Sequence, residues 1–316
     1  MSFGVRVTLL VVLLLSIPGP AAQAAARADF AGLVDIGDGR QMYLECRGVG
    51  FPTVVLIAGG FEAGFMWTYA LDLADPIHAA TEDVFPVGAD LQKRETAVFP
   101  AVSKFTRVCL YDRPNTVVGE NIAEERNGQI STPVPQPHPL ENDVADLHAL
   151  LTAAGEPGPY VLATHSYGGL IAELYARRYP KDIAGQVLVD VTSVYLKETL
   201  TPQEYDELNA KVSVPPFPGS ETFGFDEAFA AIRAAPPAPQ IPAVVLTADK
   251  LGKGLLPTRK AELLEAHNRL AAQLGAKHIT DTNSGHHIHV EQPQLVTDAI
   301  REVVDAVRSG SWQPAR

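Results

Sequence analysis

Short apolar, β-branched runs alternate with longer amphipathic stretches along most of the chain. Short runs bounded by turn residues are typical of buried strands, whereas apolar residues every three or four positions are typical of helices. The short runs predict strands at residues 32–36, 41–47, 53–57, 107–111, 160–163, 185–189, 243–246 and 278–280. The periodic stretches predict helices at residues 141–154, at 169–179 and from Pro293 onward.

The order of these elements indicates the fold class. The first two strands flank Asp38-Gly39, a dipeptide that favours a tight hairpin because both of its residues accept positive φ. From residue 141 onward, strands and helices alternate, which implies parallel strands joined by right-handed crossovers. The pattern predicts an α/β fold with a mostly parallel eight-stranded sheet and helices on both faces.

Two connections are much longer than the few residues that usually join neighbouring elements, at 61–104 and 192–240. The second is rich in proline but has helical patterning around residues 205–208 and 225–232. We interpret 192–240 as a small mobile cap inserted over the functional site. The alternative is a disordered surface insertion.

The first residues have the pattern of an export signal. Arg6 precedes an apolar run at 7–17, and Pro18-Gly19-Pro20 and the small residues of 22–24 follow it. A membrane anchor is the alternative, but a spanning helix needs about 20 apolar residues. We therefore predict a cleaved signal peptide at 1–24, one domain at 25–316, no stable membrane anchor, and a secreted or periplasmic location.

Composition narrows the range of partners. The chain has 37 acidic and 25 basic residues and a formal net charge of −12. An acidic protein binds polyanions poorly, so nucleic acid and anionic membrane surfaces are not expected partners. Nothing in the sequence indicates an oligomeric state. The two cysteines, Cys46 and Cys109, could form a bridge in an oxidising compartment.

Ser166 is the candidate nucleophile. It lies in Thr164-His165-Ser166-Tyr167-Gly168-Gly169, between a predicted strand and a predicted helix. Such a turn holds a serine clear of its own backbone, and Gly168 lacks the Cβ that would collide there. The usual pattern is Gly-x-Ser-x-Gly, and Thr164 replaces its first glycine. The alternative is a serine in an ordinary turn.

A serine needs a general base, and His286 is the candidate. It follows the last predicted strand, at the carboxyl edge where α/β sheets place their sites. His286, His287 and His289 could instead bind a metal or form a surface run. Side chains at adjacent positions point apart in an extended chain, and no Cys or carboxylate motif accompanies them, so we expect no metal.

The acid that orients the imidazole is expected between the serine and the histidine in chain order. Asp249, just after the strand at 243–246, is the preferred candidate. Asp190, at the end of the strand at 185–189, is the alternative, since either strand end could bring a carboxylate to His286.

Two backbone N–H groups are needed to stabilise a developing oxyanion. Tyr167, the residue after the nucleophile, is expected to supply one. The glycine-bearing turn Ala58-Gly59-Gly60-Phe61 is expected to supply the other, with Gly60 preferred and Phe61 as the alternative. A Gly-Gly turn alone is only a turn, so this assignment depends on the serine turn.

Several segments in this order resemble the α/β-hydrolase superfamily, in particular exported bacterial serine hydrolases and esterases. They are VVLxAGG, RVCLYDRP, DLHALL, HSYGGLIAELYARRYP and SGHHIHVEQPQLVTDAI. The resemblance covers the chain from about residue 32 to the C-terminus. This sequence departs from the common wording at Ala58, Thr164 and Asn115. The resemblance also implies that the strand with Cys46 lies beside the strand with Cys109, and hence a disulfide between them.

The expected activity is ester hydrolysis by Ser166, His286 and an aspartate, with no cofactor. The same groups could serve amide or N-terminal proline cleavage, acyl transfer or perhydrolysis. Dehalogenase and epoxide hydrolase members of the superfamily use an Asp where this chain has Ser166. A non-catalytic binding module is the alternative from another class.

The substrate is expected to be a small molecule with an apolar acyl or alcohol group. Aromatic residues near the predicted site favour this, although such residues are more often core. They are Phe61, Phe65, Trp67 and Tyr167.

Overall fold

The structure, a computed structural model, describes Met1 and residues 28–72, 91–250 and 260–312. The expected signal peptide therefore lies, apart from Met1, outside the described residues. Within the described part of the chain, no helix is both long enough and apolar enough to cross a membrane.

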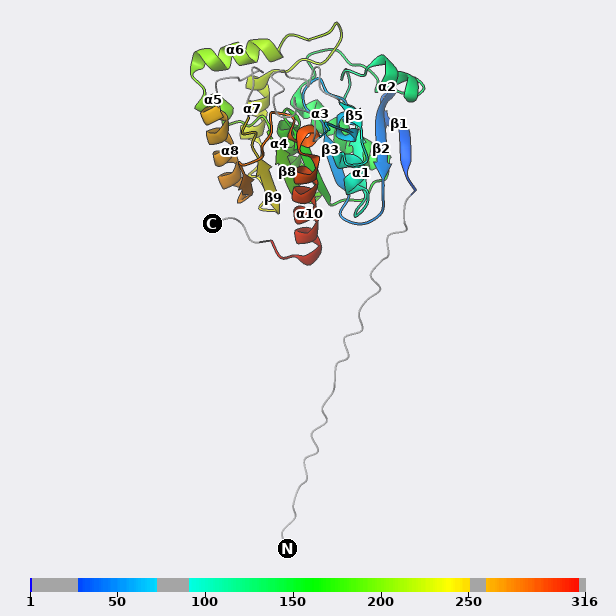
Figure 1. The fold of residues 1–316 in the computed structure, drawn as a ribbon, viewed down its shortest axis with the longest axis vertical. Coiled ribbons are helices and arrows are strands. Elements are labelled where there is room, and N and C mark those ends of the chain that lie inside the picture. Colours follow the sequence, from blue (N-terminus) through cyan, green and yellow to red (C-terminus); the bar gives the residue numbers. More distant parts are fainter. Residues whose placement is uncertain (2–27, 73–90, 251–259, 313–316) are drawn as a thin grey trace.

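An eight-stranded sheet forms the centre of the protein, in the order β1-β2-β6-β3-β7-β8-β9-β10 (Figure 1). β1 pairs antiparallel with β2 and β2 with β6, and all the other pairs are parallel. The predicted mostly parallel sheet with a leading hairpin is confirmed. The strands are β1 (Phe30–Gly37), β2 (Arg40–Arg47), β3 (Val54–Ile57), β6 (Val108–Tyr111), β7 (Tyr160–His165), β8 (Ile183–Val189), β9 (Ala243–Leu246) and β10 (Lys277–Ile279).

Helices cover both faces of the sheet, as predicted. One face buries apolar side chains of α3 (Leu140–Ala153), α4 (Gly168–Arg178) and α8 (Lys260–Leu274). The other face packs against α1 (Val98–Val102) and α10 (Pro293–Ser309), which cross in front of the strands in Figure 1. Two hydrophobic cores, one on each side, therefore hold the strands in place.

The amphipathic pattern of the last helix is confirmed by burial. Val296, Ile300 and Val303 of α10 are fully buried, and Val307 packs beside them. Five α-helices of the described residues were not predicted: α1, α2 (Glu120–Glu125), α5 (Leu196–Thr199), α8 and α9 (Ile288–Glu291). Four of them have only four to six residues, too few to show a helical period, and alanines such as Ala266 and Ala271 make up part of the buried side of α8.

The two long connections contain secondary structure. The first holds η1 (Gly64–Thr68), β4 (Tyr69–Ala70), β5 (Gln92–Lys93) and α1, and residues 73–90 of it lie outside the described residues. Residues 192–240 form α5 (Leu196–Thr199), α6 (Pro202–Val212) and α7 (Phe225–Ala234). A capping box between Thr201 and Glu204 starts α6. Because α6 and α7 also bury apolar side chains, this segment is an ordered insertion between β8 and β9.

Cys46 and Cys109 are joined by a disulfide. They lie directly opposite one another on the antiparallel strands β2 and β6, so the expected pairing is confirmed. The bond closes a loop with a sequence separation of 63 and links the leading hairpin to the parallel part of the sheet.

Replacing both cysteines, as Cys46→Ser with Cys109→Ser, is expected to lower the free energy of unfolding by about 2–5 kcal/mol, because the unfolded chain loses a cross-link. Urea unfolding of the wild-type and double-variant proteins measures the difference. Intact mass before and after denaturation and reduction is the control. A mass that does not change would show that the bond is not formed.

Candidate active site

Ser166 lies in a tight turn between β7 and α4. Its φ is +50°, in the left-handed region that a non-glycine residue seldom adopts. A Cβ on Gly168 would lie 2.9 Å from the carbonyl oxygens of Ala58 and Ile57, so only glycine fits there. The helix therefore starts very close to the end of β3, and the serine is held at the carboxyl edge of the sheet.

Two of the departures from the common motif, Thr164 and Asn115, fit this geometry. Thr164 is a fully buried residue of β7, in register with Ile57 of β3 and Leu188 of β8. A second close approach of the helix comes at Gly169, where a Cβ would lie 2.4 Å from the Cβ of Val191, in the loop after β8. Asn115 adopts a φ of +63°, a conformation that explains why glycine often occupies that position.

His286 contacts Asp190, and not the preferred Asp249. The Nδ1 atom of His286 lies 2.7 Å from Oδ2 of Asp190, whose side chain is fully buried. Asp249 instead accepts the backbone N–H of Ser284 at 2.9 Å and so braces the loop that carries the histidine. The preference for Asp249 as the partner of His286 is therefore wrong, and the alternative that we weighed, Asp190, takes that position.

The backbone at Asp190 explains why it reaches the histidine. β8 ends at Val189, and Asp190 turns with a φ of +43°. Its Oδ1 accepts the N–H of Ala248 at 2.8 Å, which leaves Oδ2 to His286. This turn could not be predicted from the sequence, because the pattern of apolar residues carries no information about the backbone angle of a single aspartate.

The electrostatic environment favours a protonated His286 paired with an ionised Asp190. Burial lowers the pKa of His286, but the hydrogen bond and negative charge of Asp190 outweigh it, with a further contribution from Glu62, so the pKa is raised. Burial raises the pKa of Asp190, but His286 and the Ala248 N–H outweigh it, so the pKa is lowered. Such a pair stabilises an imidazolium.

The glycine-bearing turn after β3 lies against the serine turn. A Cβ on Gly59 would lie 3.2 Å from the Cβ of Ser166, and a Cβ on Gly60 would lie 3.5 Å from that of Tyr167. The N–H of Phe61 donates to the Glu221 carboxylate, which removes Phe61 as an anion-binding donor. The N–H of Gly59 donates to Glu62. These contacts leave Gly60 as the candidate donor in this turn.

A buried ion pair that the sequence analysis missed holds this turn. Arg113 follows β6 and donates to the carbonyl oxygens of Ala58 and Gly59. It also forms a two-pronged salt bridge with Glu221 of the 192–240 insertion, and both side chains are almost fully buried. In the sequence, the available sign of this pair was Arg113, a charged residue just after a predicted strand. Glu221 is distant from it in sequence, and no pattern along the chain pointed to it.

Two of the four aromatic residues expected near the site lie there. Phe61 and Tyr167 pack against Phe223 of the insertion, with ring centroids 4.9 Å and 4.0 Å away. Trp67 is fully buried and belongs to the core. Phe65 packs edge-on against Tyr69. The insertion thus contributes an aromatic side chain beside Gly60 and Tyr167.

A histidine cluster lies behind the serine turn. His165 precedes Ser166, and its Nε2 lies 3.0 Å from the backbone carbonyl oxygen of His286. Its Nδ1 lies 3.1 Å from Oε2 of Glu62, and Oε1 of Glu62 lies 2.7 Å from Nε2 of His287. This network connects the turn after β3, the end of β7 and the loop of His286.

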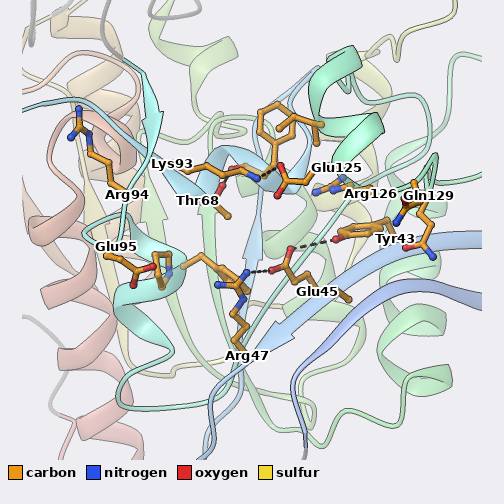
Figure 2. Close-up of a pocket in the computed structure, with 16 residues that line it drawn as sticks. Tyr43, Glu45, Arg47, Thr68, Lys93, Arg94, Glu95, Glu125, Arg126 and Gln129 are labelled. Carbon is orange, nitrogen blue, oxygen red and sulfur yellow. Dashed lines mark hydrogen bonds and ion pairs between the residues drawn. The ribbon is translucent and has the colours of Figure 1, made fainter.

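A separate polar hollow lies beside β2, η1 and α2 (Figure 2). Its cations are paired with acids: Lys93 with Glu125, Arg47 with Glu45, and Arg126 with Asp112. None of Ser166, His286 and Asp190 lines it. This hollow is therefore not part of the candidate active site.

Comparison with known proteins agrees with the fold. The model of the alpha/beta hydrolase family matches residues 54–299, and this chain belongs to that family. An uncharacterized protein of Schizosaccharomyces pombe is 30% identical over 161 residues, which cover 49% of this chain and 26% of that protein. The chain thus matches about a quarter of the length of that relative.

Solved structures of the same fold differ in chemistry. A thermophilic esterase from Thermogutta terrifontis has a TM-score of 0.54 and 19% identity, over 88% of this chain and 98% of that one. A hydrolase from Pseudomonas aeruginosa PA01 has a TM-score of 0.53 and 19% identity, over 86% and 97%. The haloalkane dehalogenase DatA from Agrobacterium tumefaciens C58 has a TM-score of 0.56 and 14% identity, over 89% and 97%. The fold therefore does not determine the reaction, which depends on the side chains of the site.

Asp143 of α3 provides a pH test of the site's surroundings. It accepts the hydroxyl of Tyr167 at 2.9 Å, and burial raises its pKa to about 7 although Arg113 opposes this. Because its pKa is higher in the folded than in the unfolded chain, the stability that it contributes at low pH is lost as the pH rises from about 4 to about 7.

Asp143→Asn removes this ionisation. The variant is therefore expected to gain stability relative to the wild type as the pH rises over that range, by on the order of 2 kcal/mol. Urea unfolding between pH 5 and pH 8 measures the trend, with the exposed Asp298→Asn as the control. A difference that is independent of pH would contradict it.

Proposed function

We propose that this chain is an exported serine hydrolase that cleaves carboxylic esters of small molecules through an acyl-enzyme. The observation that carries the proposal is the 2.7 Å contact between Asp190 and His286, at the sheet edge that also holds the strained turn of Ser166. The predicted signal peptide at 1–24 and the Cys46–Cys109 disulfide support export to an oxidising compartment.

The proposed reaction has two halves. Ser166 Oγ attacks the ester carbonyl while Nε2 of His286 takes its proton, and the tetrahedral intermediate expels the alkoxide, which receives that proton. Water, activated by the same nitrogen, then attacks the acyl-enzyme, and the serine is regenerated. Asp190 accepts from Nδ1–H of His286 throughout, which keeps Nε2 turned away from the acid and available to the serine.

The backbone N–H groups of Gly60 and Tyr167 are the proposed oxyanion donors. A Cβ on Gly60 would lie 3.5 Å from the Cβ of Tyr167, so the two backbones are close to one another. Arg113, paired with Glu221, holds the glycine turn in place. The N–H of Gly60 therefore need not reorganise when negative charge develops on the substrate oxygen. Phe61, Tyr167 and Phe223 support an apolar group on the substrate.

Ser166→Ala is expected to abolish both labelling by a fluorophosphonate probe and hydrolysis of p-nitrophenyl esters, because the probe and the ester react with the same oxygen. Gel fluorescence and a chain-length series of esters, run beside an aminoacyl amide, measure this. Ser193→Ala, at another buried serine, is the matched control. Labelling that persists in Ser166→Ala would reject this nucleophile. Faster cleavage of the amide would change the substrate class.

Asp190→Asn is expected to lower kcat by about 10⁴-fold, because the amide would neither hold His286 in the correct tautomer nor stabilise the positive charge of its imidazolium. Asp249→Asn is the matched control, and we expect a loss of less than about tenfold, since that carboxylate accepts the backbone N–H of Ser284 and not the imidazole of His286. Steady-state kinetics on the best ester compares the two. A larger loss in Asp249→Asn would reverse the assignment.

A further inference from the structure

A second group of functional side chains lies behind Ser166, buried away from solvent. Glu62 follows the glycine turn, His165 ends β7, and His289 belongs to α9 (Ile288–Glu291). Each side chain is almost fully buried. One nitrogen from each imidazole and one carboxylate oxygen all lie within 4.8 Å of one another. Three segments that are distant in sequence thus bring nitrogen and oxygen donors to one point.

Both ring nitrogens of His165 face oxygen atoms that accept hydrogen bonds. Its Nε2 faces the carbonyl oxygen of His286, and its Nδ1 faces the carboxylate of Glu62. A neutral imidazole carries only one N–H, so it can donate to only one of these two oxygens. If Nε2–H donates to His286, the Nδ1 lone pair points at a carboxylate oxygen. A cation between these two atoms would remove the repulsion.

Within the described residues, the ion pairs of Glu62 are with His165 and His287, and no Lys or Arg pairs with it. Its carboxylate also accepts the N–H of Gly59. A buried carboxylate that faces two imidazoles and no permanent cation is a favourable place for a metal ion.

His289 is the independent observation. Neither of its ring nitrogens has a hydrogen-bond partner among the described residues, although the side chain is 1% exposed. An unsatisfied buried donor or acceptor is destabilising, so such groups are rare without a ligand. Its ring lies between His165 and Trp67, with both centroids 4.5 Å away. The free nitrogens therefore belong to the same buried cluster as Glu62.

We propose that Glu62, His165 and His289 bind a divalent metal ion of the zinc class. Two imidazoles and a carboxylate suit zinc, whose bonds of about 2.0–2.2 Å place neighbouring ligand atoms about 3.3–3.5 Å apart. The 3.1 Å between Nδ1 of His165 and Oε2 of Glu62 is close to such an edge. One ring nitrogen of His289 lies within 4.8 Å of the ligand atoms of Glu62 and His165 and supplies the third ligand.

The outer contacts also match a metal site. Ligating histidines usually donate their other N–H to a carbonyl or carboxylate, as Nε2 of His165 would to His286. Ligating carboxylates are themselves hydrogen-bonded, as Glu62 is by Gly59 and His287. The ion would tie the glycine turn, the serine turn and the histidine loop together, a structural role that does not depend on the proposed ester hydrolysis.

From the sequence we expected no metal at His286, His287 and His289, because side chains at adjacent positions point apart in an extended chain and no Cys or carboxylate motif accompanies them. Only His289 belongs to the proposed site, and its two partners come from other elements.

The test loads the full chain, purified without metal-chelating resin, with Zn²⁺ or Co²⁺ and then removes the free ion. We expect about one Zn²⁺ per chain by mass spectrometry, visible d–d absorption with Co²⁺, and a Tm that rises by about 5 °C at a Zn²⁺ concentration a hundredfold above Kd. A chelator should reverse the shift.

Two variants localise the binding. His289→Leu should lose the Zn²⁺ and Co²⁺ signals yet keep or raise the metal-free Tm, since it removes two unpaired buried nitrogens. Glu62→Gln should lose the signals as well. It provides the same test if His289→Leu does not fold. The exposed His148→Gln is the matched control and should retain them. Wild-type protein that retains no Zn²⁺, or binding that survives in both cluster variants, would overturn the proposal.

Discussion

The closeness of the serine turn to the end of β3 is the constraint on which the site depends. Gly168 and Gly59 have no room for a side chain, because carbonyl oxygens of β3 face the first and His165 and Glu62 face the second. This packing places the backbone of Gly60 beside Tyr167. It also holds Ser166, with a positive φ, at the carboxyl edge of the sheet. A Cβ at either glycine would force apart the turn of Gly59-Gly60 and the turn of Ser166.

Buried charged groups hold the surrounding loops in their places. Arg113 and Glu221 join β6 to the 192–240 insertion and fix the glycine turn between them. Asp249 and Glu291 accept backbone N–H groups of Ser284 and Gly285, just before His286. Pairing of this kind is needed because a lone buried charge is very costly. These contacts therefore tie the loops of the site to the rest of the fold, although the loops themselves belong to no strand or helix.

Family membership establishes the fold of this chain but does not establish its reaction, since an esterase and a haloalkane dehalogenase share its architecture. The argument for ester hydrolysis rests on Ser166 and on the Asp190–His286 contact. The histidine cluster behind them is a separate feature. It has its own unpaired nitrogens and its own carboxylate, and these call for an explanation that acyl transfer does not provide.

The sequence by itself determined the strands, the main helices, the sheet class, and Ser166 and His286 as candidates, because each depends on local periodicity or on a short motif. Only the tertiary structure decided between Asp190 and Asp249, since both follow parallel strands and the choice depends on one backbone turn at positive φ. The Arg113–Glu221 pair and the Glu62–His165–His289 cluster were likewise invisible. Their members are separated by about a hundred residues or more, and a pattern along the chain carries no information about which distant side chains meet.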